Sequence, residues 1–190
     1  MQTMISNKNI IITGKPGCGK STLISRLKEY LNTDFTIKIG GISTPEIRRD
    51  GVRVGFNIIN IYSNEIGILS HINQKSGPRI SKYKVNLKDL NEIGVKAIVF
   101  AIKNCDIIFL DEIGKMEIIS KNFQNAVLDA FNSSKIVIAT MGLRIRHTFI
   151  DEIKSRNDIE ILHLTINNRE NIFKQIKQFL LLKFKNKLKN

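Results

Sequence analysis

Short apolar runs alternate along the chain with longer stretches in which apolar side chains recur every three or four positions. A short continuous run is typical of a strand buried on both faces, whereas the wider spacing is typical of a helix with one buried face. The runs that predict strands are Ile10–Thr13, Thr36–Gly40, Ile107–Leu110, Ile136–Ala139 and Ile159–Leu164. The stretches that predict helices are Lys20–Leu31, Leu87–Asn104, Lys121–Phe131 and Arg169 to about Lys187.

Strands that alternate with helices predict an α/β fold, in which helices cover both faces of a mostly parallel sheet. One segment departs from the alternation. Val52–Ile61 and Glu65–Ser70 resemble two strands joined by the turn residues Ser63 and Asn64. Because this segment is too short to bury a core alone, we expect a β-hairpin inserted into the main sheet rather than a second domain.

The chain has 190 residues, of which 42% are hydrophobic, and this is enough for one sizeable core. We therefore expect a single domain over residues 1–190, with Val52–Ser70 as an insertion and Arg169–Asn190 as a basic C-terminal helix. No apolar run approaches the roughly 18–20 residues of a membrane span, so no membrane partner is expected. Cys18 and Cys105 have no metal-binding or redox spacing, which favours a reduced, cytoplasmic setting.

The formal net charge is +13. A basic chain can bind nucleic acid, an acidic membrane surface or polyphosphate. Here the positive charge is spread widely and becomes dense only in Lys183–Lys189, which favours a solvated helix face over a dedicated nucleic-acid patch. Nucleic-acid binding is therefore an alternative that we do not favour, and the sequence does not give the oligomeric state.

The first predicted strand leads into a glycine-rich loop, and the first predicted helix begins where that loop ends. The glycines allow backbone N–H groups to turn toward phosphate oxygens, and the helix directs its positive dipole end at the same anion. Lys20 is expected to reach the β- and γ-phosphates, and the Ser21 hydroxyl to bind Mg²⁺. The loop matches the pattern G-x-x-x-x-G-K-[ST]. The residues expected to bind the nucleotide here are those of the pattern, Gly14, Lys15, Pro16, Gly17, Cys18, Gly19, Lys20 and Ser21, together with the next residue, Thr22.

A second motif follows the run Ile107–Leu110, where Asp111 and Glu112 come directly after four apolar residues. Carboxylates at the end of a buried strand are typical of a Walker B motif, which lies beside the phosphate loop. We expect Asp111 to hold Mg²⁺ directly or through water, and Glu112 to act as the general base that activates the attacking water. The two motifs together predict a site for a nucleoside triphosphate (NTP).

The segment Asp111–Gly114 also fits the D-x-x-G pattern of GTP-binding switches. Those proteins normally carry N-K-x-D for guanine, and that sequence does not occur in this chain. We therefore discount a GTPase switch.

The block Asp-Glu-Ile-Gly-Lys-Met-Glu at Asp111–Glu117 resembles the signature of the THEP1-type nucleoside-triphosphatases, also called cancer-related NTPases, within the P-loop NTPase superfamily. The resemblance runs in order from about Ile10 to Asn171. It implies a RecA- or adenylate-kinase-like three-layer sandwich and Mg²⁺-dependent hydrolysis of ATP, GTP and other NTPs to NDP and phosphate. The further blocks that resemble the family are Gly41–Arg48, Gly51–Phe56, Gly77–Tyr83 and Asn168–Asn171.

Two positions depart from the family pattern. Met141 and Gly142 follow Ala139-Thr140, where the family often has proline, and Ser81 stands where glycine is common. Either change could alter base or phosphate contacts without removing the core chemistry.

Several further residues are weaker candidates for the site. Thr140 ends a predicted strand, where it would sense the γ-phosphate or orient water, although a plain strand end explains it equally well. Asn168 and Arg169 precede the last helix and would contact the base or start that helix. The candidates for neutralising transition-state charge, each of which also fits a solvated surface position, are Arg48, Arg53, Arg79 and Lys115.

An NTP phosphohydrolase is the leading interpretation, with water as acceptor. A nucleotide or small-molecule kinase on the same scaffold is the first alternative, but no clear arginine-rich lid segment is visible. An RNA-associated NTP-binding module that uses the basic tail is the second, and salt-sensitive RNA retention would support it. The scattered His71, His147 and His163 suggest no metal site or catalytic dyad.

Overall fold

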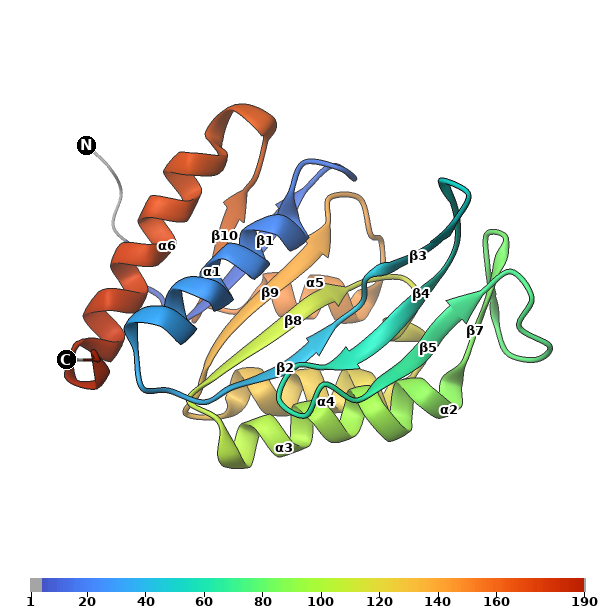
Figure 1. The fold of residues 1–190 in the computed structure, drawn as a ribbon, viewed down its shortest axis with the longest axis horizontal. Helices are drawn as coiled ribbons and strands as arrows, with labels where there is room; N and C mark the ends of the chain where they lie inside the picture. The colour runs from blue at the N-terminus through green and yellow to red at the C-terminus, as the bar shows by residue number, and fades with distance from the viewer. Residues whose placement is uncertain (1–4, 190) are drawn as a thin grey trace.

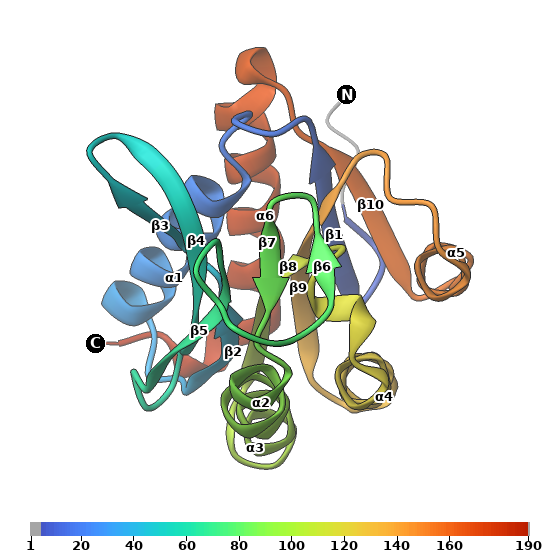
Figure 2. The same cartoon turned by 90° about the vertical axis from the view of Figure 1, so that its right-hand side faces the viewer.

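The computed structural model describes residues 5–189 and shows a ten-stranded sheet with helices on both faces (Figures 1 and 2). The strands lie in the order β10-β1-β9-β8-β2-β4-β5-β7-β6, and β3 pairs with β4 outside this path. The strands are β1 Asn9–Gly14, β2 Ile39–Ser43, β3 Glu46–Arg49, β4 Val52–Asn60, β5 Ile66–His71, β6 Arg79–Ile80, β7 Tyr83–Val85, β8 Ile107–Ile113, β9 Ile136–Gly142 and β10 Ile159–His163. The α-helices are α1 Lys20–Asp34, α2 Leu87–Asp89, α3 Lys96–Asn104, α4 Lys121–Asn132, α5 Thr148–Lys154 and α6 Arg169–Phe184.

The parallel half of the sheet consists of β10, β1, β9, β8 and β2. The inner strands are almost fully buried; all six residues of β1 are buried, for example, whereas β10 at the edge of the sheet has one buried residue. Such strands read as continuous apolar runs because helices cover both of their faces. The predicted α/β fold with a parallel core is therefore confirmed.

Two apolar clusters, one on each face of the sheet, form the core. In β1, Ile11 packs in the cluster that contains the buried faces of α3, α4 and α5, whereas Ile10 and Ile12 pack in the cluster under α1 and α6. Figure 2 shows the two groups of helices on opposite sides of the sheet. This arrangement is the three-layer sandwich that the family resemblance implied, and it fixes the strand ends that carry the polar residues described below.

An antiparallel extension of the sheet begins beyond β2. The predicted hairpin is present, because β4 pairs antiparallel with β5. The extension is larger than predicted, since β3, β6 and β7 join it. Ser81, between β6 and β7, has a φ of 55°, in the region that favours glycine, so the glycine that the family resemblance implies at this position fits the backbone.

Several helices differ from the expectation, and α1, for example, ends at Asp34 rather than Leu31. The predicted Leu87–Asn104 helix is helical throughout, but a π-helix at Leu90–Val95 separates α2 from α3. The C-terminal helix predicted over Arg169–Asn190 is shorter than expected, because α6 ends at Phe184 and a 3₁₀ turn follows at Lys185–Lys187. Asn190 lies outside the described residues. Helix α5 was not predicted. Within residues 5–189, none of the helices combines the length and apolar character needed to cross a membrane.

Candidate nucleotide site

The topology of the parallel half brings the predicted motifs to one edge of the sheet. Strand β9 lies between β1 and β8, so the carboxyl ends of these three strands are neighbours. The glycine-rich loop follows β1, Asp111 lies near the end of β8, and Thr140 lies near the end of β9. Ligands of open α/β sheets bind at this edge.

The glycine-rich loop has a backbone that requires its glycines. Gly17 and Gly19 have φ values of 75° and 98°, which other residues rarely adopt. The loop closes with a hydrogen bond of 3.2 Å from the Cys18 N–H to the Lys15 carbonyl, and Gly19 caps the start of α1. The Lys20 ammonium donates to the Gly14 carbonyl at 3.3 Å, which holds its charge beside the loop. This is the geometry expected of an anion cradle at a helix N-terminus.

Arg169, at the start of α6, holds the loop from its outer side. Its Nε donates to the Cys18 carbonyl at 2.7 Å, and its guanidinium also donates to the Gly17 carbonyl at 3.3 Å. A Cβ on Gly19 would lie 2.9 Å from the Arg169 Nε, so only glycine allows this close approach. A cavity of about 130 Å³ opens beside the guanidinium, and its lining residues are Gly17, Gly19, Thr22, Leu23, Arg26 and Arg169.

Two hydroxyl groups converge on one carboxylate oxygen at the sheet edge. Ser21 donates to Asp111 Oδ1 at 3.1 Å, and Thr140 donates to the same oxygen at 2.6 Å. Asp111 is 7% exposed and Thr140 is fully buried. Hydroxyl and carboxylate oxygens are the hard donors that Mg²⁺ prefers, and Mg²⁺ is commonly held by one or two protein groups together with substrate phosphates. The donor set therefore fits the ion. In residues 5–189 no group of three or more His, Cys, Asp and Glu side chains forms another metal site.

Thr44 was missed by the sequence analysis, although it lies in this network. Its hydroxyl donates to the Asp111 carbonyl at 2.9 Å and accepts from the Glu112 N–H at 3.2 Å. Thr44 directly follows β2, which pairs with β8 in parallel. Only the strand order of the sheet reveals this contact, and the sequence signal was limited to its place in the Gly41–Arg48 block.

Glu112 is half-buried directly after Asp111, and the peptide bond between the two is cis. Burial raises the pKa of the Glu112 carboxyl, the positive charge of Lys20 lowers it, and the negative charge of Asp111 raises it. A carboxylate with a raised pKa is a stronger base than an exposed one. The net direction of the shift is the one that strengthens Glu112 as a proton acceptor.

A second buried glutamate, Glu117, lies close to Glu112. Its side chain comes from the 3₁₀ turn Glu117–Ile119 that follows β8, and the residue is 3% exposed. Burial raises the pKa of the Glu117 carboxyl to about 8, and the charge of Glu112 adds to that rise. Glu117 ends the Asp111–Glu117 family block, and nothing in the sequence distinguishes it from a solvated acidic residue in a turn.

The remaining candidates already have partners. Arg48 and Arg53 both form ion pairs with Glu46, at 2.6 and 2.7 Å. Arg53 also donates to the Tyr83 hydroxyl at 3.0 Å, which joins the β3–β4 hairpin to β7. Arg79 donates to the Ser81 carbonyl. These contacts hold the antiparallel extension together, and a role in charge stabilisation stays a prediction for each arginine.

Lys115 and Asn168 differ from each other in their surroundings. Lys115 is exposed in the turn that follows β8. The Asn168 amide accepts from the Thr165 N–H at 2.8 Å and donates to the His163 carbonyl at 2.9 Å. These bonds belong to the 3₁₀ turn Ile166–Asn168 that precedes α6, and the Asn168 side chain makes no capping bond to α6 itself. Contact with the base stays a prediction.

Comparisons with known proteins agree with this geometry. A family model described as NTPase matches residues 9–177. The chain is 44% identical over 167 residues to the nucleoside-triphosphatase THEP1 of Thermotoga sp. (strain RQ2), covering 88% of this chain and 92% of that protein. It is 42% identical over 167 residues to the protein of the same name from Methanosarcina acetivorans, covering 88% and 93%.

Two solved structures are similar in fold. The crystal structure of THEP1 from Aquifex aeolicus has a TM-score of 0.78 at 31% identity, covering 90% of this chain and 98% of that one. The solution structure of a human cancer-related nucleoside triphosphatase has a TM-score of 0.75 at 27% identity, covering 90% and 96%. The similarity thus extends over nearly the full length of each protein.

Proposed function

This chain belongs to the THEP1-type nucleoside-triphosphatase family, and we propose that it hydrolyses NTPs to NDP and phosphate with Mg²⁺ and little base preference. One observation carries the proposal: Ser21 and Thr140 converge on Asp111 Oδ1 beside the Lys20 loop, with Glu112 next in the chain. The proposed phosphate loop, the proposed metal-binding oxygens and the half-buried Glu112 carboxyl therefore lie at one sheet edge.

The reaction assigns a separate task to each side chain. Backbone N–H groups of the loop and the Lys20 ammonium bind the β- and γ-phosphates. Bound Mg²⁺, held by Ser21 and Asp111, would supply positive charge that offsets the charge developing on the phosphate oxygens. Glu112 takes a proton from water while the water oxygen forms its bond to the γ-phosphorus. The bond from the γ-phosphorus to the bridging oxygen breaks, and the NDP oxygen leaves with the electron pair.

The residues that line the 130 Å³ cavity beside the loop support the use of NTPs with different nucleobases. Its lining residues include two arginines and one threonine but no carboxylate or amide side chain. Guanine-specific sites need acceptors for the guanine N–H groups, and the sequence carries no N-K-x-D. A guanidinium plane, such as that of Arg169, can stack on any base because every base has a π face.

The test uses purified full-length protein with ATP, GTP, CTP and UTP in turn, with Mg²⁺ or with EDTA, and measures free phosphate and the nucleotide products. We expect phosphate and NDP in equal amounts from each NTP, and only with the metal. Release of pyrophosphate would contradict the proposed reaction, as would NDP formed without phosphate. A strong preference for GTP in competition would contradict the broad specificity alone.

A further inference from the structure

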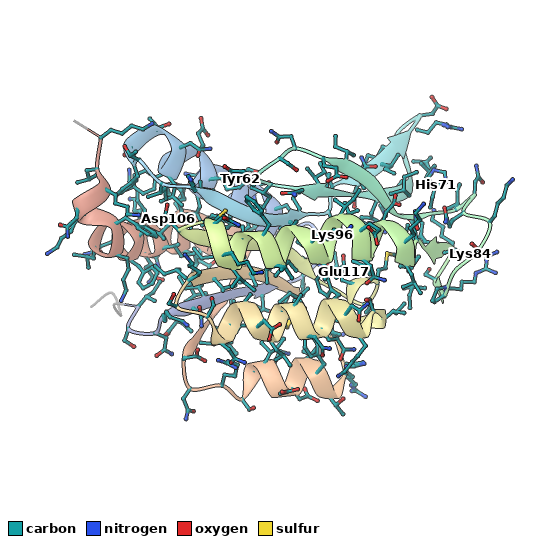
Figure 3. The ribbon with its side chains drawn as sticks, turned by 90° about the horizontal axis from the view of Figure 1, so that it is seen from below. Tyr62, His71, Lys84, Lys96, Asp106 and Glu117 are labelled. Carbon is teal, nitrogen blue, oxygen red and sulfur yellow. The ribbon has the colours of Figure 1, made fainter. Side chains whose placement is uncertain are left out.

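The carboxyl groups of Glu112 and Glu117 meet at Gly114. A Cβ placed on Gly114 would lie 2.6 Å from Glu117 Oε2 and 2.8 Å from Glu112 Oε1. Both carboxyl groups therefore border the same space beside Gly114, which a side chain at that position would fill. Glu117 is labelled in Figure 3, where it lies between the ribbons of α3 and α4, away from solvent.

The turn that carries Glu117 is held by other contacts. The Ile118 N–H donates to the Gly114 carbonyl at 3.1 Å, and the Ser120 N–H donates to the Glu117 carbonyl at 3.2 Å. The Gln124 amide of α4 donates to the Ile118 carbonyl at 2.7 Å. The Gly114 and Glu117 N–H groups of this turn also bond the Glu117 carboxyl, but they lower its pKa less than burial and the nearby negative charges raise it. Burying an ionisable group is costly, and the bonds within the turn do not offset that cost.

We propose that Glu117 is a positioning residue for hydrolysis, whose buried carboxyl group holds the Glu112 carboxylate in place toward the attacking water. The inference rests on the proposed function. Glu112 has three rotatable side-chain bonds, and a misplacement of about 1 Å can cost about 10²-fold in rate. A neutral Glu117 carboxyl supplies an O–H donor to an ionised Glu112, and such charge-assisted bonds are short and strong.

The charges around Glu117 favour the neutral form. Burial and the negative charges of Glu112 and Asp111, both on β8, raise its pKa, and the N–H groups of Glu117 and Gly114 lower it less. The positive charge on the adjacent helix α4 is that of Lys121, whose ammonium donates a hydrogen bond to the Gln124 side chain at 3.2 Å rather than to Glu117. With a pKa of about 8, most Glu117 carboxyls carry their proton at neutral pH.

The experiment compares three variants of the full chain with wild type, using ATP and Mg²⁺. Glu117→Ala removes the donor, and we expect kcat to fall by about 10²-fold with an unchanged Kd for ATP. Glu117→Gln keeps the size and an N–H donor, and we expect it to retain kcat within a few-fold at neutral pH. Gln124→Ala loosens the same turn without touching a carboxyl, so it serves as the structural control and should retain most activity.

A pH profile gives a readout that a structural role would not move. As pH rises through about 8, Glu117 loses its proton, cannot donate, and repels Glu112, so wild-type kcat should fall. Glu117→Gln cannot ionise and should lack that fall. Thermal melting of each variant checks that it is folded. If Glu117→Ala does not fold, the comparison of the kcat–pH profiles of Glu117→Gln and wild type decides the question.

Three outcomes would overturn the inference while phosphate release by wild type upholds the proposed function. They are full activity in folded Glu117→Ala, an equal loss in Gln124→Ala, and an alkaline fall shared by wild type and Glu117→Gln. If wild type releases no phosphate from any NTP, the proposed function fails first and this inference fails with it.

Discussion

Replacing Glu117 by glutamine should change how the stability of the protein depends on pH. The Glu117 pKa is raised in the folded state from 4.5 to about 8. Between these values the unfolded chain carries an ionised Glu117 while the folded chain must keep the carboxyl neutral. A raised pKa stabilises the fold fully below about 4.5, and that contribution is lost as pH rises through about 8.

The size of the effect follows from the shift. One pKa unit corresponds to about 1.4 kcal/mol, so the wild-type free energy of unfolding should lose at most about 5 kcal/mol over this interval from Glu117 alone. That is large beside the roughly 5–15 kcal/mol that separates most folded domains from their unfolded chains. Glu117→Gln has the same shape and no charge, so it removes this loss. As pH rises, the free energy of unfolding of the variant should therefore increase relative to that of wild type. The difference between the two proteins should change by several kcal/mol from its value in acid.

The assay is urea unfolding of both proteins without nucleotide at about pH 5, 7 and 9, spanning the interval of the shift. The difference in unfolding free energy between variant and wild type should grow from pH 5 to about pH 8 and then level off. Glu65→Gln, an exposed carboxyl in the turn between β4 and β5, is the control and should show a much smaller trend. A difference that stays constant with pH would refute the view that Glu117 is buried as a neutral acid.

Three further substitutions test the site. Asp111→Asn should lower Mg²⁺-dependent turnover by at least about 10²-fold, since metal charge stabilisation is worth several kcal/mol; full activity of wild type in EDTA would contradict the metal role. Thr140→Val removes the 2.6 Å hydrogen bond to Asp111 and should lower the free energy of unfolding in urea by about 1.5–3 kcal/mol. Thr140→Ser should keep that bond and most of the stability. Equal stability of the Val and Ser variants would refute this. Arg169→Lys should weaken ATP binding about 10-fold, because lysine cannot donate to the Gly17 and Cys18 carbonyls together. The control is Arg156→Lys, which alters the Asp158 ion pair just before β10, at the end of the sheet away from the loop, and should leave ATP affinity unchanged. Equal ATP affinities of wild type and Arg169→Lys in calorimetry would contradict the role given to Arg169.

The parallel half of the fold was predictable because burial on both faces leaves a strong signal. Strands such as β1 and β8 appear as unbroken apolar runs, and the loop and acidic pair follow them directly. Strand β3 left no such signal, since none of its four residues is buried and its position depends on pairing with β4. Helix α5 has seven residues, which is too short for a clear helical period.

The sequence predicts the site residues that lie within a recognisable motif. It does not predict the residues that reach the site from other segments of the chain, because their contacts form only in the folded structure. Asp111 and Ser21 meet as expected, because strand ends and helix starts share one edge. The contacts of Thr44 with the Asp111 carbonyl and of Glu117 with the Gly114 turn depend on strand order and on the path of a turn. Charge alone makes Arg48 and Arg53 candidates for stabilising the transition state, and only the structure shows that both form ion pairs with Glu46.

The most direct test of the account is Glu112→Gln, measured for binding and chemistry in the same preparation. Calorimetry with ATP and Mg²⁺ reports affinity, and single-turnover phosphate release reports the chemical step. General-base catalysis typically contributes about 10²–10⁴-fold, so the account predicts affinity within a few-fold of wild type and release slowed by about 10²-fold or more. Phosphate release at the wild-type rate, with normal binding, would contradict the assignment of Glu112 as the base.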